Sequence, residues 1–407
     1  MKITIISNLY HPYVRGGAEI VARTMAEGLR AQLQHVSVIT TQPFEGLRSL
    51  MPSSGTVNDV PAYRFYPINI YFYLLDFKFP SVVRALWHII DIFNVHSAWV
   101  VYTLLKRERP DVVITHNLMG IGFLIPRVIA LLRIRHVHVI HDVQLVNPSG
   151  IIIVGREKNP LQLIMTMMGY SRFMRWLFKK TSLIISPSQF LLTFYERYGF
   201  FVHAEKKVLP NPVAPHDTAP TNATSDILRL VYLGTISEPK GIVQLVRLVH
   251  DLPLDVQLRL NVIGVGTELK SLMDSVATDT RIVFYGWRVR DEIMNIFSES
   301  DMLIAPTICY DNSPTVVYEG LSYGLPALVT DAGGAQEIVH DGYNGFVVPA
   351  KNWLALRERI IDLARHPEQL VPLAHNAAPS VAGLSVDAYV TRLLTMLETE
   401  TGEHLNR

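Results

Sequence analysis

The sequence has a single cysteine, Cys309, among 407 residues, so no internal disulfide can form and a reducing cytoplasm is the expected compartment. No uninterrupted apolar run reaches the roughly 18 residues of a membrane-spanning helix. The longest candidate, at 121–132, is broken by Pro126 and Arg127. The first residues carry one lysine and too short an apolar run for a signal peptide, so we expect them to form a strand. These absences argue against a disulfide-stabilised secreted domain and against an integral membrane protein.

Acidic residues are scarce in the first half of the chain. Residues 1–212 contain 23 Lys and Arg but 12 Asp and Glu, a formal charge of +11, whereas residues 213–407 carry −10. This asymmetry favours a first half that meets an anionic partner. It contains no basic helix with interleaved aromatic residues and no known nucleic-acid motif, so we expect an anionic membrane surface rather than nucleic acid.

Two domains are expected, because 407 residues exceed the roughly 250–300 that one hydrophobic core accommodates. The clearest boundary is 214–226, rich in Pro, Thr, Ala and Asn, which separates a first domain, 1–212, from a second, 213–384. Apolar runs typical of buried parallel strands alternate with helical patterns in both domains, which predicts two doubly wound α/β domains. These runs lie at 2–7, 36–40, 112–116, 137–142 and 183–186, and at 230–233, 258–263, 282–287, 302–305 and 327–330.

Two stretches of the first domain are each open to two interpretations. The aromatic, proline-containing residues 42–80 fit either a variable acceptor-side segment or an irregular packed excursion. The basic residues within 150–180 alternate with apolar ones, which suits either an anionic membrane surface or a core helix with a solvated basic face. The apolar members are Met165, Met167, Met168, Phe173, Trp176, Leu177 and Phe178.

The first domain contains two further candidate features. Gly16 and Gly17 follow the first strand and open a helix, which is either a phosphate-binding geometry or a plain strand-to-helix turn. His116 and His141 end successive strands, where ligands of parallel sheets bind, although such histidines are often structural. No third ligand accompanies them, so their spacing does not suggest a metal site.

The second domain contains a candidate anion site between the strands at 302–305 and 327–330. Ser313 and Pro314 suit the start of a helix, and Gly324 suits its end. We expect the helix amides of Thr315, Val316 and Val317 to face an anion, and Gly333 and Gly334 to permit close approach of a ligand to the backbone. Asp311 and Glu319 supply carboxylates for sugar or ribose hydroxyls. The alternative is a strand–helix–strand unit with ordinary capping.

A nicotinamide-binding motif is incomplete in the second domain. Gly264 and Gly266 follow a strand, but Leu269 stands where a third glycine is needed, so a dehydrogenase is disfavoured.

The run from Asp311 to Val339, with the pattern DNSP-x4-EGLSYGLPALVTDAGG-x2-EIV, resembles the donor-site motif of family 4 retaining glycosyltransferases. That resemblance implies the GT-B fold, with two facing Rossmann-like domains, an interdomain cleft and a final helix, about 385–407, that returns to the first domain. It also implies roles for site residues. Asp311 and His141 would approach the donor sugar, Glu319 the ribose, Lys240 the diphosphate, and Gly16 and Gly17 the diphosphate and acceptor. The sequence departs from the family at Asp311, usually Glu, and at Thr235, usually Arg.

The resemblance implies transfer of a sugar, with retention, from a nucleotide-diphosphate sugar to an acceptor hydroxyl of a lipid-linked or surface-polysaccharide saccharide. No Asp-x-Asp pair is present, so we expect no metal, and Lys240 with the helix amides would stabilise the leaving group. Two alternatives are an epimerase or phosphorylase of the same architecture and a non-catalytic nucleotide- or glycan-binding protein. We expect a cytoplasmic protein, peripheral on the membrane.

Overall fold

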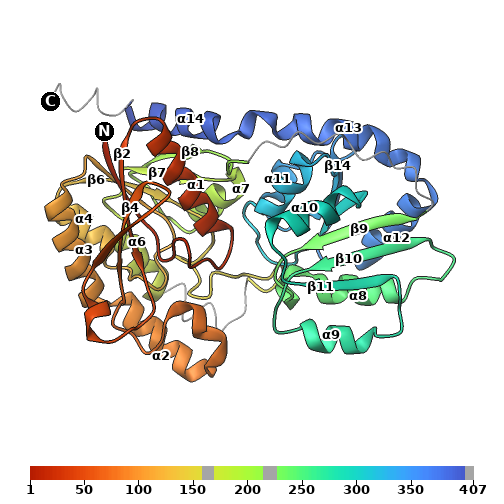
Figure 1. Cartoon of the computed structure of the whole chain (residues 1–407), viewed down its shortest axis with the longest axis horizontal. Coiled ribbons are helices and arrows are strands. Elements are labelled where there is room, and N and C mark those ends of the chain that lie inside the picture. Colours follow the sequence, from red (N-terminus) through yellow and green to blue (C-terminus); the bar gives the residue numbers. More distant parts are fainter. Residues whose placement is uncertain (158–168, 214–226, 399–407) are drawn as a thin grey trace. The chain divides into compact units, whose positions relative to one another are not determined.

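The computed structural model describes residues 1–157, 169–213 and 227–398, and these residues form two compact units (Figure 1). The N-terminal unit contains residues 1–150, 169–212 and 386–398, and the C-terminal unit contains 151–157, 213 and 227–385. Residues 151–157, which the sequence places in the first domain, therefore group with the C-terminal unit. No helix within these described ranges is long and apolar enough to cross a membrane.

The N-terminal unit is built on an eight-stranded sheet in the order β3-β4-β2-β1-β5-β6-β7-β8, in which only the β3–β4 pair is antiparallel. The strand order reverses between β1 and β5, so the loops that follow these two strands meet at one edge of the sheet. The strands are β1 (Lys2–Ile6), β2 (His35–Thr41), β3 (Ser53–Val57), β4 (Val60–Phe65), β5 (Val112–Thr115), β6 (Arg135–Val139), β7 (Leu183–Ser186) and β8 (Glu205–Val208).

Helices of the N-terminal unit include one from the end of the chain. Helix α14 packs beside α1, and its Tyr389, Val390 and Leu393 are buried in the same core as the β1 residues (Figure 1). The contact with α1 is close, because a Cβ atom at Gly28 would lie 2.6 Å from Val390. The helices are α1 (Gly17–Ala31), α2 (Ser81–Ile92), α3 (Val95–Glu108), α4 (Ile125–Leu131), α6 (Ser171–Leu177), α7 (Gln189–Arg197) and α14 (Val386–Glu398), with 3-10 turns η1 (Leu47–Leu50) and η2 (Tyr73–Lys78).

The C-terminal unit is built on a six-stranded parallel sheet in the order β11-β10-β9-β12-β13-β14. Its order reverses between β9 and β12, which is the point where ligands bind in open α/β sheets. The strands are β9 (Leu228–Leu233), β10 (Leu258–Ile263), β11 (Ile282–Gly286), β12 (Met302–Ala305), β13 (Ala327–Thr330) and β14 (Gly345–Val348).

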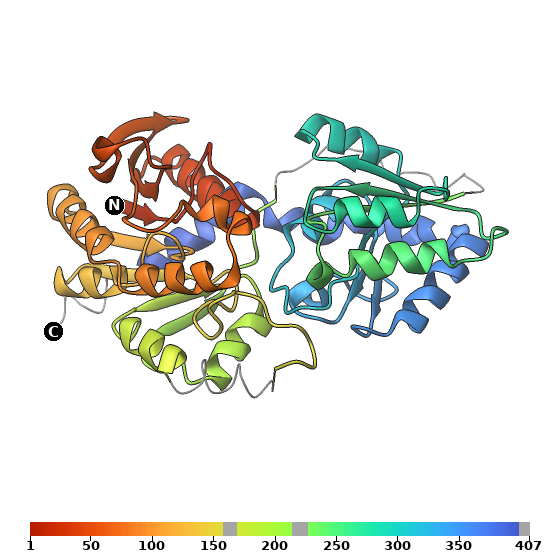
Figure 2. The same ribbon diagram turned by 90° about the horizontal axis from the view of Figure 1, so that it is seen from below.

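Helices lie on both sides of this sheet (Figure 2). Successive strand residues accordingly alternate between two apolar clusters, with Leu230 in one and Val231 in the other. The helices are α8 (Ile242–His250), α9 (Leu269–Ser275), α10 (Arg290–Ser298), α11 (Thr315–Ser322), α12 (Trp353–Arg365) and α13 (Leu370–Val381), with 3-10 turns η4 (Glu238–Lys240), η5 (Gly334–Glu337), η6 (Pro367–Gln369) and η7 (Ala382–Leu384).

Candidate functional site

Two loops meet where the strand order of the C-terminal unit reverses. One follows β9 and ends in η4, and the other follows β12 and leads to α11. The amide of Ile308 donates to the carbonyl of Pro239 at 3.0 Å, and the hydroxyl of Thr307 donates to the same oxygen at 3.1 Å. These bonds place the predicted cation of the first loop next to the predicted acid of the second.

Lys240 and Asp311 form an ion pair in which the ammonium donates to Oδ2 of the carboxylate. The two side chains remain 37% and 19% exposed. Burial alone would lower the pKa of Lys240, but the charge of Asp311 and the hydrogen bond outweigh it, and the pKa of Lys240 is raised. The ammonium is therefore charged at neutral pH and accessible to an anionic ligand.

The backbone around Gly333 and Gly334 packs directly against the backbone of the Asp311 loop. The amide of Asp311 donates to the carbonyl of Ala332 at 3.2 Å, and the amide of Gly334 donates to the carbonyl of Asp311 at 3.0 Å. A Cβ atom at Gly333 would overlap that same carbonyl. Gly333 is therefore needed for the close contact with the Asp311 loop, and the approach of a ligand to these two glycines stays a prediction.

The start of α11 differs from the predicted cap. The helix begins at Thr315 with Pro314 as the capping residue, and no side chain caps it. The hydroxyl of Ser313 instead lies 2.8 Å from the hydroxyl of Tyr318. The amide of Val317 donates to the carbonyl of Pro314 at 3.0 Å. This amide is therefore occupied, whereas the sequence predicts that it faces an anion.

Within the described part of the chain, the amides of Thr315 and Val316 donate to no backbone carbonyl. They stand at the positive end of the helix dipole. The C-terminal glycine was predicted correctly, because Gly324 follows the helix with φ of 78°.

Glu319 lies half-buried in α11. Burial raises the pKa of its carboxyl, and the positive charge of Arg290, at the start of α10, opposes that rise. Arg290 is thus near enough to act on this acid electrostatically. Thr235, which stands where the resembled family has Arg, is exposed, and its carbonyl accepts a hydrogen bond from Tyr232.

The N-terminal unit places Gly16 and Gly17 at the start of α1. The amide of Gly16 donates to the carboxylate of Glu19 at 2.8 Å, so this glycine amide is occupied by the helix's own capping acid. Burial raises the pKa of Glu19. The structure therefore supports the plain-turn interpretation for Gly16.

His116 and His141 lie in contact at the ends of β5 and β6. Nδ1 of His116 and Nε2 of His141 are 2.8 Å apart, and the two rings are nearly parallel, at 18°. Burial lowers the pKa of both, to about 4 for His141. Both rings are thus neutral at neutral pH, and one donates a hydrogen bond to the other.

Asp142 follows His141 and has an unusually high pKa, about 7, chiefly because it is buried and secondly because Glu19 lies close to it. Its Oδ1 accepts from the amide of Gln144 at 2.8 Å. The sequence offered no signal for the proximity of Asp142 and Glu19, because it arises from the pairing of distant strands.

Residues 151–157 form hydrogen bonds with the loop that contains Asp311. Ile153 forms an antiparallel bridge with Cys309, and the amide of Tyr310 donates to the carbonyl of Ile152 at 2.9 Å. The hydroxyl of Tyr310 donates to Oε1 of Glu157 at 2.9 Å. Sequence reasoning missed this contact because neither segment has a periodic pattern that marks a strand.

The predicted apolar-and-basic segment at 150–180 divides in the structure. Leu177 and Phe178 are buried in the N-terminal unit, which fits the core-helix alternative, whereas Trp176 is exposed. Met165, Met167 and Met168 lie outside the described residues.

Two family models match the chain. The model described as Glycosyltransferase Family 4 matches residues 15–217, and the model described as Glycosyl transferases group 1 matches residues 217–378. An uncharacterized 42.6 kDa protein in the cps region of Klebsiella pneumoniae is 24% identical over 339 residues, which span 83% of this chain and 87% of that protein. The lipopolysaccharide 1,2-N-acetylglucosaminetransferase of Salmonella typhimurium is 28% identical over 212 residues, which span 47% of this chain and 55% of that protein.

A solved structure of similar fold is HepE of Anabaena in complex with UDP-glucose. It matches with a TM-score of 0.71 over 98% of this chain and 100% of that chain, at 18% identity. This likeness and the two doubly wound sheets confirm the GT-B fold class.

Proposed function

The chain belongs to the group 1 glycosyl transferases and is therefore a transferase enzyme, and we propose that it transfers a sugar, with retention, from a nucleotide-diphosphate sugar to an acceptor hydroxyl. The observation that carries this proposal is the Lys240–Asp311 pair at the β9/β12 strand reversal, next to the start of α11. A cation and a carboxylate side by side suit the two halves of such a donor: a diphosphate and a sugar with several hydroxyls. HepE, which shares the fold, binds UDP-glucose, and this supports a donor of that class.

We assign the residue roles that the family resemblance implies. Lys240 and the amides of Thr315 and Val316 bind the diphosphate and stabilise its charge as it leaves, without a metal ion. Asp311 accepts hydrogen bonds from the donor sugar, and Glu319 accepts them from the ribose hydroxyls.

In the N-terminal unit, His141 is neutral because burial lowers its pKa, and in this proposal it forms a hydrogen bond with the donor sugar. Gly17 is the first residue of α1, and in this proposal it lies next to the acceptor.

The acceptor in this proposal is a lipid-linked or surface-polysaccharide saccharide, reached from the cytoplasmic face of a membrane. The Salmonella relative's name, a lipopolysaccharide N-acetylglucosaminetransferase, supports a saccharide acceptor of that kind. The charge of +11 on residues 1–212 supports contact with an anionic membrane.

A panel of nucleotide-diphosphate sugars, scored by thermal shift and by slow hydrolysis, tests this function. We expect one donor to raise the melting temperature and to be hydrolysed, and the product made with an acceptor to keep the donor's anomeric configuration by NMR. Nucleotide binding without any turnover would favour the non-catalytic alternative. Conversion of the donor sugar without an acceptor would favour the epimerase or phosphorylase.

A further inference from the structure

Helix α2 in the N-terminal unit turns its apolar side outward. The residues that it buries are Trp87 and Asp91, whereas the exposed fractions of Leu86 and Ile89 are 52% and 54%. The exposed apolar residues of α2 and its C-cap recur at helical spacing and form one stripe. They are Val82, Leu86, Ile89, Ile90 and Phe93. A surface helix normally buries such a stripe, so this one needs a partner.

The outer surface of α2 carries no carboxylate. Asp91 is the one acid within Ser81–Ile92, and it is fully buried, where it accepts a hydrogen bond from the amide of Gly120 at 2.9 Å. Arg84 is exposed on the same helix. Arg84 is about 200° around the helix from Val82 and from Leu86, so it lies on the other side of α2 from the stripe. The stripe itself therefore contains no charged side chain of α2.

Aromatic contacts connect the α2 stripe to α6. The ring of Phe93 lies 5.2 Å from that of Phe173, which stacks on Trp176 at 5.5 Å between ring centroids. The guanidinium of Arg127 lies 4.3 Å above the Trp176 ring. Trp176 remains 48% exposed, so apolar and aromatic side chains pass from α2 to α6 along the surface.

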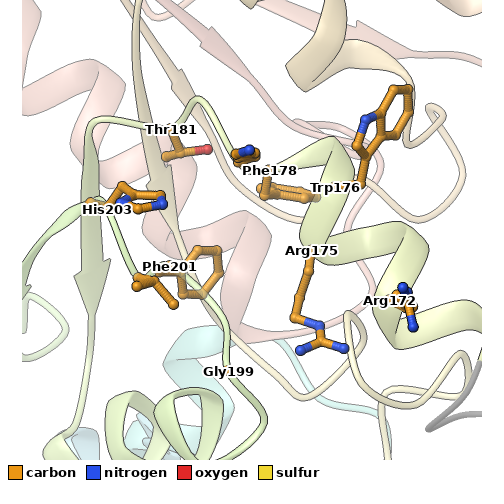
Figure 3. A pocket seen from close by; sticks show the side chains of 11 residues that line it. Arg172, Arg175, Trp176, Phe178, Thr181, Gly199, Phe201 and His203 are labelled. Carbon is orange, nitrogen blue, oxygen red and sulfur yellow. The ribbon is translucent and has the colours of Figure 1, made fainter.

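A pocket of about 460 Å³ opens on α6 and on residues 199–204 (Figure 3). Arg172, Arg175, Lys179 and His203 line it, and none of its 11 lining residues is acidic. Figure 3 shows Arg175 reaching from α6 towards Gly199, with His203 on the facing segment. Nε of Arg175 is buried and has no hydrogen-bond partner within the described part of the chain.

We propose that the α2 stripe, Phe173, Trp176 and this pocket together form a docking surface for an anionic lipid bilayer. The stripe enters the boundary between headgroups and acyl chains, and the pocket holds the phosphate of an anionic headgroup. Charge complementarity decides for a bilayer, because the pocket offers three cations and no acid, and an apolar stripe beside cations is what anionic membranes attract. The proposal rests on the lipid-linked acceptor proposed above, and names the surface that would bring the enzyme to it.

Flotation with vesicles tests the docking surface. We expect the protein to float with phosphatidylcholine vesicles that contain anionic phosphatidylglycerol, to bind pure phosphatidylcholine far less, and to be released at high salt. Leu86→Asp with Ile89→Asp should abolish flotation. Arg172→Gln with Lys179→Gln should lower the affinity about 25-fold, about fivefold for each basic residue removed.

Matched control variants lie in the C-terminal unit. Leu254→Asp with Leu354→Asp changes two exposed leucines, and Arg259→Gln with Lys270→Gln changes two exposed cations. Both double variants should float like the unchanged protein. Flotation that survives the α2 and pocket variants, or that falls equally in the controls, overturns the proposal.

Two further measurements test whether a second copy of the protein covers the stripe, and whether the docking surface and the proposed function stand or fall separately. If the unchanged protein is a dimer by analytical ultracentrifugation and Leu86→Asp with Ile89→Asp makes it monomeric, a second copy covers the stripe and the bilayer proposal is wrong. Nucleotide affinity should be unchanged in the α2 double variant. A protein that floats but binds no nucleotide sugar contradicts the proposed function and leaves the docking surface standing.

Discussion

The ammonium of Lys240 donates a hydrogen bond to the carboxylate of Asp311, so the groups assigned to the donor diphosphate and to the donor sugar satisfy each other's charge. A diphosphate that binds Lys240 must share that ammonium with Asp311. Binding of the diphosphate by Lys240 and of the sugar by Asp311 is therefore coupled. A variant of either residue should change the interaction that the other makes with the donor.

Lys240→Ala should weaken nucleotide-diphosphate binding at least tenfold, because hydrogen bonds to charged groups contribute about 1.5–3 kcal/mol. Isothermal titration calorimetry with the donor nucleotide measures this. Lys270→Ala, an exposed lysine of the same unit, is the control and should bind normally. Equal affinity in the two variants would remove the diphosphate role of Lys240.

Asp311→Asn should separate nucleotide binding from transfer. Because the carboxylate no longer competes for Lys240, affinity for the nucleotide diphosphate without its sugar should rise severalfold, whereas sugar transfer should fall. Asp311→Glu, with one more methylene, should keep or raise the activity. Loss of nucleotide affinity in Asp311→Asn would show that Asp311 positions Lys240 rather than competing for it.

Gly333→Ala should displace the Asp311 loop. A Cβ atom there overlaps the Asp311 carbonyl, while the backbone φ of Gly333 is 161°, an extended value that alanine adopts. We therefore expect weaker donor binding from steric displacement and no effect from backbone strain. Gly383→Ala, where a Cβ meets nothing within 4 Å, is the matched control. Unchanged donor affinity in Gly333→Ala would mean that the loop adapts.

The parallel strands and the loops that follow them were predictable because buried apolar runs and glycine-rich turns are local signals. The strands at 302–305 and 327–330 are confirmed by β12 and β13, whereas the pairing of Lys240 with Asp311 depends on the β9–β12 adjacency, which only the structure shows. Strand β8 was missed because its sequence, Glu-Lys-Lys-Val, is that of a charged edge strand. Residues 42–80, for which the sequence favours either a variable acceptor-side segment or an irregular packed excursion, contain the β3–β4 hairpin.

The parts of the site that sequence could not reveal depend on long-range contacts. The bridge between Ile153 and Cys309 joins residues 156 positions apart. The occupied amide of Val317 follows from cap geometry, whereas that of Gly16 depends on the side chain of Glu19, three residues along the chain. The outward apolar stripe of α2 has the periodicity of a buried helix face, so only the structure shows that it faces outward.

Glu319→Gln should weaken nucleoside-diphosphate binding about tenfold and should also remove a dependence on pH. Burial raises the pKa of Glu319, so on acidification this carboxyl takes up its proton at a higher pH than an ordinary glutamate. Affinity of the unchanged protein should therefore begin to fall above the usual glutamate range, and the Gln variant should show no such fall. Calorimetry between pH 4.5 and 8 measures both. Parallel profiles would assign the titration to another group.

Asp91→Asn should stabilise the protein, and more so at pH 8 than at pH 5. Burial raises the pKa of Asp91 to about 8, from an ordinary value of 3.8. Between these values the folded protein holds a proton that the unfolded chain has released, so the free energy of unfolding falls as pH rises, by at most about 1.4 kcal/mol per pH unit. Asparagine still accepts the Gly120 hydrogen bond and carries no charge. Urea unfolding at both pH values measures the difference, with the exposed Asp274→Asn as control. An equal fall in the Asp91→Asn variant would show that Asp91 is not the titrating group.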